Sequence, residues 1–439
     1  MREILGDLGL FRDGRFALLF SARTLSMLGT AFAPVALAFG VLGLPGATAT
    51  TLSVVLTAES LPMVLFMLFA GVLADRFPRQ RVMMAGEWAN ALAFFGLAAM
   101  LLSGWTPLWA LATAAACSGV AIAVLYPALT GIIPEVVPPD RLQAGNALLG
   151  LGANVARMAG AVAGGATVVL VGGGWALAVS GGLFAVAGVL ISLVRPTPLV
   201  AATPLVAATP LVAATPLVAA TPLVAARQER RSVLKDLREG WREFSSRQWI
   251  WVVVAQFSIL VMAVQAGHGV LGPLLAKESL GGPAAWSAFL AGEAIGTIAG
   301  VMVSLRVRPR RPILVGTLLC LPSALPYFLL GSGAPLWVTV AGAFVLGVCF
   351  DVFGVLWTTT MQREVPPESL SRVSSYDALG SLMFGPVGLM LAGPAAALMG
   401  VHNALLACGG LVVLSTCAAL LSPGVRGLRA PARVEAVSA

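Results

Sequence analysis

Five charged residues lie inside long apolar stretches of this 439-residue chain, and they are the residues best placed to do chemistry. They are Arg23, Glu59, Arg157, Glu293 and Asp351. A charge at the centre of a membrane is costly, so each needs a compensating role. Buried carboxylic acids can gain and lose protons, whereas arginine stays charged. Three acids against two arginines leave one acid to exchange protons, which is the arrangement that a proton-coupled carrier needs.

Helical spacing places four of these charges at about mid-depth, and Arg23 about two turns from one membrane edge. At that depth the Arg23 side chain could also extend to lipid phosphate. Glu59 has no polar stripe around it, and a carboxyl kept neutral between helices is the alternative there. The other three charges share helical faces with small and polar residues: Arg157 with Asn146, Gly150, Asn154, Gly160 and Gly164; Glu293 with Gly296 and Gly300; Asp351 with Gly347, Gly354 and Thr358.

The elements that must position these charges are membrane-spanning helices. The chain is 58% hydrophobic and 10% charged, and its mean hydropathy is +0.93, which excludes an ordinary soluble domain. A helix needs about 20 apolar residues to cross the hydrocarbon core. Twelve segments qualify, at roughly 16–42, 48–73, 82–102, 106–133, 142–170, 174–194, 249–276, 284–305, 312–330, 335–361, 374–399 and 401–421. We find no cleavable signal peptide, because the first apolar run is too long.

A thirteenth apolar stretch consists of five copies of TPLVAA at 197–226. Proline every six residues disfavours a regular helix. If this stretch stays outside the membrane, all of the 27 Lys and Arg residues except Arg23, Arg157 and Lys277 face the cytoplasm, as the positive-inside rule requires. If the stretch instead crosses the membrane, every later loop lies on the opposite side, and most of the later arginines would face outward. We therefore interpret it as a cytoplasmic linker, followed at 231–244 by an amphipathic helix at the membrane interface.

Two short motifs recur and indicate an internal duplication. PLW at 107–109 returns at 335–337, and VPPDRL at 137–142 returns as VPPESL at 365–370, each 228 residues later. The same offset pairs Gly119 with Gly347. The fourth and tenth spans are therefore expected to be duplicates, in two six-helix halves related by an axis along the membrane normal.

The segment GVLADRFPRQR between spans two and three resembles the loop signature of the major facilitator superfamily. Gly71, Asp75, Arg76 and Arg81 match it, whereas Arg79 replaces a glycine and Gln80 a basic residue. The resemblance implies a cytoplasmic gate between the halves. Together with YPALTGIIPEVVPPDRLQAGNAL at 126–148, the loop is most similar to the enterobactin-exporter and macrolide-efflux branch. RMAGAVAGG at 157–165 is similar to the antiporter helix-packing motif, through Gly160, Gly164 and Gly165.

The resemblance implies where the charges meet. In this superfamily spans five and eight meet across the two halves, so we expect an Arg157–Glu293 ion pair, with each facing the cavity alone as the alternative. Span ten lines the cavity in that fold, which makes Asp351 the first candidate for the proton carrier and Glu59 its rival. His268 is expected to be a hydrogen-bonded wall residue. Six tryptophans at span ends are expected to form an interfacial belt: Trp105, Trp109, Trp175, Trp249, Trp286 and Trp337.

Other chemistry finds little support. The five cysteines lie inside spans with no CxxC pair, and neither Lys235 nor Lys277 follows a glycine as a Walker A lysine does. We find no metal-ligand spacing, GxSxG or His–carboxylate cluster, so the sequence predicts no enzyme, no metal and no cofactor. The basic excess of +8 is explained by membrane orientation and needs no nucleic acid.

The expectation is an all-α membrane protein with twelve transmembrane helices in two parallel six-helix halves, the major facilitator fold. Residues 1–194 would form the N-terminal half, 195–248 the cytoplasmic linker, 249–421 the C-terminal half and 422–439 a cytoplasmic tail. The expected function is proton-coupled export of a small amphipathic molecule, with both termini cytoplasmic in the plasma or inner membrane. Its partners would be substrate, protons and membrane lipids, and the chain would be a monomer. The alternatives are nutrient uptake by the same fold, or a permease subunit that depends on a separate ATPase.

Overall fold

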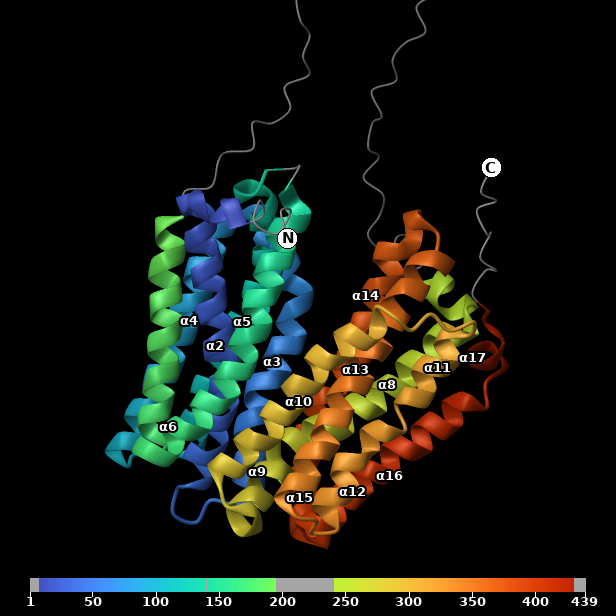
Figure 1. The fold of residues 1–439 in the computed structure, drawn as a ribbon. Coiled ribbons are helices and arrows are strands. Elements are labelled where there is room, and N and C mark those ends of the chain that lie inside the picture. Colours follow the sequence, from blue (N-terminus) through green and yellow to red (C-terminus); the bar gives the residue numbers. More distant parts are fainter. Residues whose placement is uncertain (1–7, 139–140, 195–240, 430–439) are drawn as a thin grey trace, which may run out of the picture.

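The computed structural model describes residues 8–138, 141–194 and 241–429, and within these ranges the chain is helical with no strand. The TPLVAA copies and most of the predicted linker lie outside the described residues. Eleven helical stretches of the described part are long and apolar enough to cross a membrane. Figure 1 shows them in two groups, with the N-terminal half drawn upright and the C-terminal half inclined beside it.

The N-terminal half contains five long helices after a short turn, η1 (Leu8–Arg12). They are α2 (Gly14–Leu42), α3 (Ala49–Arg76), α4 (Arg79–Ser103), α5 (Leu108–Val136) and α6 (Leu142–Leu193). Asp13 caps the start of α2, since its carboxylate accepts from the Arg15 amide at 2.9 Å. Hydrogen bonds from the Arg15 side chain lower the pKa of Asp13 below its usual value.

Helix α6 crosses the bundle twice. At 52 residues it would be about 78 Å long if straight, more than twice the membrane core. Gly172 breaks it with φ 82°, a left-handed conformation that glycine adopts without strain. The chain then turns back, so that Gly160 contacts Leu28 of α2 while Phe184, past the break, contacts Gly29. With α6 counted as two spans, the described chain has the twelve spans that the sequence predicts.

The C-terminal half is built from more interrupted helices. Its first span joins α8 (Gln248–Ala266), η3 (Gly267–Leu271), α9 (Gly272–Leu275) and η4 (Ala276–Leu280). Then follow α10 (Pro283–Ser304), a span made of α11 (Pro312–Leu319), η5 (Pro322–Ala324) and α12 (Leu325–Gly331), and α13 (Leu336–Glu364). The last elements are α14 (Pro367–Met383), α15 (Gly385–Met399), α16 (Val401–Leu420) and the short α17 (Pro423–Gly427). Helices α5 and α13 begin and end 228 residues apart, as the duplicated motifs predict.

The two ends of the bundle differ. We call the end where α2 begins and α3 meets α4 the basic end, because it carries arginines of the connecting loops such as Arg79, Arg81, Arg308 and Arg311; the other is the far end. In Figure 1 the basic end is at the top, and the halves diverge toward it.

The described close approaches between the halves gather at the far end. A Cβ added to Gly393 of α15 would lie 2.6 Å from the Cα of Thr50 in α3. A Cβ on Gly165 of α6 would lie 3.0 Å from the carbonyl oxygen of Pro283 in α10. Lys277 of η4 donates a hydrogen bond to the Leu42 carbonyl at the end of α2. Among the described residues, the close contacts between the halves therefore lie at the far end.

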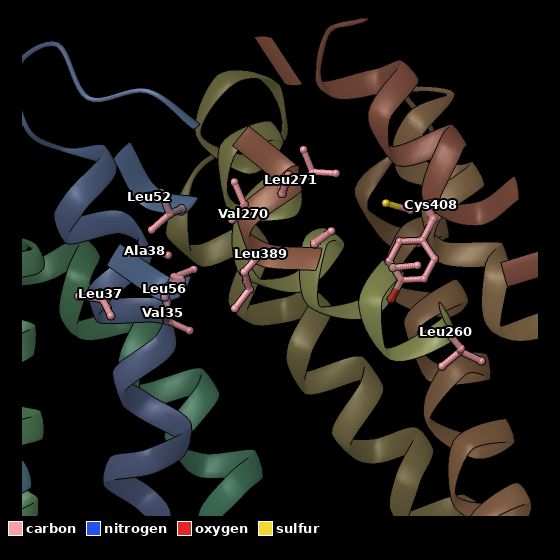
Figure 2. Packing of buried hydrophobic residues seen from close by; sticks show 14 of the residues in the cluster. Val35, Leu37, Ala38, Leu52, Leu56, Leu260, Val270, Leu271, Leu389 and Cys408 are labelled. Carbon is pink, nitrogen blue, oxygen red and sulfur yellow. The ribbon is translucent and has the colours of Figure 1, made fainter. Parts of the chain in front are cut away.

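An apolar seal lies just inside these contacts. Figure 2 shows Leu52 and Leu56 of α3 opposite Val270 and Leu271 of η3, with Leu389 of α15 beside them. Leu52, Val270 and Leu271 are at most 1% exposed. Leu56 and Leu389 both pack against Gly269, where a Cβ would lie 3.3 Å from Leu56 Cδ1 and 2.4 Å from Leu389 Cδ2. The buried apolar side chains of this layer therefore close the far end of the space between the halves.

The predicted amphipathic helix falls mostly outside the described residues, but residues 241–246 at its end are helical. Phe244 is 6% exposed, and its ring lies 5.7 Å from that of Trp241 and 5.9 Å from that of Tyr376 in α14. This end of the segment therefore packs onto the C-terminal half of the protein.

Candidate functional site

A cavity of about 750 Å³ lies between the two halves, between the apolar seal and the basic end. Its walls are mainly apolar and come from both halves, including α2, α3, α6, α10, α13 and α15. Four of the five charged residues singled out in the sequence line it: Glu59, Arg157, Glu293 and Asp351. A cavity of this size is in the range of sites that bind small organic molecules.

Asp351 and Arg157 face one another across the cavity. Asp351 lies on α13 and is within electrostatic reach of Arg157 on α6. Arg157 donates a hydrogen bond to Asn154 one turn earlier, which fixes the direction of its side chain. The Asp351 Oδ2 atom is buried and has no hydrogen-bond partner. Asp351 thus retains an unused acceptor beside a permanent positive charge.

Glu293 lies beside His268, in an aromatic surround. Its Oε2 is 3.8 Å from His268 Nε2, too long for a hydrogen bond but close enough for an ion pair once the imidazole is protonated. The His268 ring has three aromatic neighbours, Trp286, Phe289 and Tyr327, with centroids 6.1, 5.6 and 5.9 Å away. The π-helical turn of η3 presents His268 to the cavity. The spacing of residues within single spans could not pair this histidine with an acid on another span.

The predicted Arg157–Glu293 ion pair is wrong for this conformation. Both residues are described and both line the cavity, but the structure pairs Glu293 with His268 and brings Arg157 into reach of Asp351. The reason is the tilt of the halves: α6 and α10 touch at Gly165 and Pro283 and then diverge toward the basic end (Figure 1). The alternative, in which each residue faces the cavity alone, does not describe the structure either, because Glu293 lies beside His268 and Arg157 is within electrostatic reach of Asp351.

Glu59 of α3 has a polar partner on another helix, which the residue pattern of α3 alone could not predict. The Ser118 hydroxyl on α5 lies 3.2 Å from Glu59 Oε1 and 2.8 Å from the Oδ1 of Asn90 on α4. A serine has one proton to donate and can serve only one of these two acceptors. Both acceptors have a hydrogen bond when Glu59 itself carries a proton and donates it to the Ser118 oxygen. The arrangement therefore suits a carboxyl that changes its protonation state.

Arg23 is separated from the other four. It lies on α2 beside a second, smaller cavity of about 90 Å³, together with Ser26 and Glu87. Arg23 is half-buried there and points into the N-terminal half. The structure therefore divides the five predicted charges into a group of four around the large cavity and one at the small cavity.

Trp249 and Trp286 are corrections to the predicted aromatic belt. Trp286 is 2% exposed, lines the large cavity and stacks on Phe289 with ring centroids 4.7 Å apart. Trp249 is 6% exposed and packs edge-on against Trp357. The other four tryptophans are at least 56% exposed, as a belt requires: Trp105, Trp109, Trp175 and Trp337. Both buried tryptophans stand near the start of a helix where it meets another helix, a position that cannot be told from a lipid-facing one in the sequence.

The three glycines of the helix-packing motif lie at close helix contacts. A Cβ on Gly160 would lie 2.6 Å from the Leu28 carbonyl oxygen, and one on Gly164 would lie 3.0 Å from that of Phe32. Both contacts are with α2. Gly165 instead faces Pro283 and Ser287 of the other half. The motif thus brings α6 close to α2 and, through its last glycine, to α10.

The gate motif is described only in part. Gly71, Asp75 and Arg76 belong to α3, but their side chains lie outside the described set. Arg79 forms an ion pair with Glu135 at the end of α5, at 3.3 Å, and Arg81 is exposed. Gln80 donates hydrogen bonds to the last carbonyls of α6, among them that of Ile191 at 2.9 Å. These contacts stay within the N-terminal half, and a role in gating stays a prediction.

The cavity can hold a small molecule and can bind protons at several carboxyl groups. No group of three His, Cys, Asp or Glu that could hold a metal ion is found in the described part of the chain.

Comparison with known proteins agrees with this geometry. A family model described as Major Facilitator Superfamily matches residues 16–383. An uncharacterized MFS-type transporter of Bacillus subtilis (strain 168), YvqJ, is 21% identical over 310 residues, which are 71% of this chain and 69% of that protein.

Three solved structures share the fold at low sequence identity. The nucleoside transporter NupG has a TM-score of 0.70 at 13% identity, over 94% of this chain and 100% of that one. A bacterial homolog of the human lysosomal transporter Spinster, in an inward-facing and unoccupied conformation, has a TM-score of 0.66 at 17% identity, over 95% and 97%. A POT family transporter in complex with 5-aminolevulinic acid has a TM-score of 0.69 at 13% identity, over 93% and 96%.

Proposed function

The chain belongs to the major facilitator superfamily, and from that premise we propose that it is a proton-coupled exporter of small amphipathic molecules. It would work as a monomer by alternating access, in the plasma or inner membrane, with both termini in the cytoplasm. The observation that carries the proposal is the cavity between the halves, in which apolar walls surround Glu59, Glu293 and Asp351.

The wall chemistry favours an amphipathic substrate. Apolar residues such as Leu37, Met63, Ile298 and Val301 form most of the surface, and Trp286 and Phe94 add aromatic faces. An apolar molecule of drug size would gain free energy by leaving water for such walls. The few polar groups would orient its polar part. Antibiotics, siderophores and other secondary metabolites belong to this class.

The charge balance favours proton coupling. Three acids and one arginine line the cavity, so two negative charges remain when all the acids are ionised and His268 is neutral. Protons can neutralise this excess, and so can a cationic group on the substrate. Competition between protons and substrate for the same carboxylates is a physical basis for antiport, since each ligand shifts the population of carrier states that it binds best.

The arrangement of the halves suits one end state of alternating access. Close contacts and the apolar seal shut the far end, while the halves diverge toward the basic end. The positive-inside rule assigns the basic end to the cytoplasm. On that orientation the structure corresponds to an inward-facing state, from which a cytoplasmic substrate reaches the cavity.

Everted membrane vesicles test this proposal and its two rivals. The probes would be ethidium, erythromycin and a catecholate siderophore, in vesicles with and without the protein. An exporter driven by protons accumulates at least one probe inside such vesicles, and a protonophore abolishes the accumulation while ATP remains. Loss on ATP depletion with an intact proton gradient would indicate a permease fed by an ATPase. Movement of the probe out of everted vesicles would indicate uptake.

A further inference from the structure

The small cavity in the N-terminal half holds a buried acid that the proposed transport cycle has not used. Glu87 on α4 is 3% exposed and lines this cavity with Arg23 and Ser26 of α2. It lies eight residues into α4, about two turns from the basic end. Glu59 lies deeper, at the large cavity, so Glu87 stands between Glu59 and the basic end of the same half.

The Glu87 carboxyl lacks a full set of partners. Its Oε2 atom is buried without a hydrogen bond. A buried polar atom without a partner destabilises the protein, and more strongly when it is charged. The cavity beside it, about 90 Å³, has room for a few water molecules. Water at Oε2 would supply the missing partner, and a proton there would remove the negative charge.

The small cavity adjoins the large one. Thr30 of α2 and Ile122 of α5 line both. Asn90, one turn along α4 from Glu87, is fully buried and is bonded to Ser118, which also contacts Glu59. The Nδ2 atom of Asn90 is a second buried group without a partner. The hydrogen-bonded groups therefore run from Glu59 through Ser118 to Asn90, which lies one helical turn from Glu87 inside the same half of the protein.

We propose that Glu87 is a second proton-binding site, which exchanges protons with Glu59 through water in the small cavity and passes them to the basic end. In the transfer the proton leaves the Glu59 carboxyl, which becomes a carboxylate, and is delivered by water to Glu87, which becomes the acid. The charge of the pair does not change. Asn90 and Ser118 hold the two carboxyls and the water in place, because an amide does not itself pass protons on.

The charges around Glu87 suit this role. Arg23 of α2 lines the same small cavity, and a positive charge there reduces the cost of ionising a buried carboxyl. Ile122 and Leu125 of α5 and Ile191 of α6 also line the small cavity, and none of them is charged. Glu59 on α3 is the other titratable group on the path. Protons would thus leave through the N-terminal half while the substrate uses the wider opening between the halves.

The test compares Glu87→Gln with Glu87→Asp, since Gln keeps the size and hydrogen bonding of Glu but cannot titrate, and Asp titrates but is shorter. Purified protein in liposomes is given a pH gradient and whichever panel probe the wild type transports. Glu87→Gln should slow gradient-driven transport at least about tenfold, with probe affinity unchanged because Glu87 does not line the large cavity. Glu87→Asp should retain more activity than Glu87→Gln. The opposite order, or full activity of Glu87→Gln, would assign Glu87 a structural role and overturn the proposal.

A second readout needs no probe and no transport. The infrared difference spectrum of the purified wild type between low and high pH should contain a carboxyl C=O band that disappears in Glu87→Gln and shifts in Glu87→Asp. The control is Glu278→Gln, an exposed acid of η4, which should leave the band in place. If Glu87→Gln does not fold, an unshifted band in Glu87→Asp overturns the proposal. The proposal rests on proton coupling, and failure of the wild type to respond to a pH gradient would instead refute the proposed function.

Discussion

Glu59 and Glu293 occupy equivalent positions in the two halves of the molecule. A Cβ on Gly119 would lie 1.9 Å from the Glu59 carbonyl oxygen, and a Cβ on Gly347 would lie 2.1 Å from that of Glu293. These glycines are equivalent members of the duplicated helices α5 and α13. In each half, the helix that packs against this glycine thus carries a glutamate that lines the large cavity.

The surroundings of the two glutamates are not equivalent. Glu59 has Ser118 at 3.2 Å, whereas the corresponding residue of α13 is Leu346, which is fully buried and apolar. Glu293 has His268 at 3.8 Å instead. One acid faces a neutral hydroxyl and the other a group that can itself become charged, so the two halves are expected to respond differently to protons.

The first prediction concerns closure of the far end. Gly393→Ala places a methyl group 2.6 Å from the Cα of Thr50, which the present conformation cannot accommodate without separating α15 from α3. Such overpacking typically costs about 1–3 kcal/mol, so the population should shift toward a state open at the far end. Spin labels at Thr48 and Leu398, in a background with Cys117 and Cys417 replaced by Ser, should report longer distances.

The matched control for Gly393 is Gly410→Ala on α16, because a Cβ there meets nothing within 4 Å. Its label distances should equal those of the background. Identical distances in Gly393→Ala would show that the α3–α15 contact does not control the far end.

The second prediction concerns the partner of Arg157. Neutralising Arg157 and Asp351 together should cost less stability than the sum of the two single changes, because each single change leaves the other charge uncompensated. We expect a coupling of at least about 0.5 kcal/mol from denaturant unfolding of Arg157→Gln, Asp351→Asn and the double variant. The cycle of Arg157→Gln with Glu293→Gln is the comparison, and a larger coupling there would restore the pair that the structure does not form.

The third prediction concerns Ser118. Ser118→Ala leaves two acceptors, on Glu59 and Asn90, without their shared hydroxyl and should cost about 1–3 kcal/mol of unfolding free energy. Ser415→Ala is the control, since that buried hydroxyl bonds only to the Val412 carbonyl of its own helix. Thermal unfolding in detergent measures both. Equal costs would mean that the Ser118 contacts contribute no stability beyond those of an ordinary buried serine.

Much of the architecture could be predicted from the sequence, because the membrane imposes simple rules. Apolar runs located the twelve spans, and proline spacing and charge distribution argued against a thirteenth. The separate spans predicted at 142–170 and 174–194 also bracketed the break that the structure has at Gly172. These features depend on single segments and on hydropathy, which a sequence displays directly.

Contacts between segments were harder to predict. The stripe of small and polar residues predicts on which face of α6 Arg157 lies. Which residue of the other half Arg157 approaches depends on the tilt between the halves. The offset of 228 residues that relates α5 to α13 would pair Glu59 with Ser287, whereas the structure places Glu293 at the equivalent position. The reason is that α3 continues past its glutamate to Arg76 while α10 ends sooner, at Ser304. Trp286 and His268 were likewise assigned from their distance to a span end, which says nothing of the neighbouring helix.

The most direct test of the account is whether protons move when substrate moves. Purified protein in liposomes with a trapped pH-sensitive dye is given a gradient of a panel probe that it transports. The wild type should move protons against the probe, and Asp351→Asn should exchange probe down its gradient while moving no protons and building no gradient. Proton-driven accumulation that persists in Asp351→Asn but is lost in Glu59→Gln would make Glu59 the carrier. Probe transport by the wild type with no proton movement at all would contradict the account.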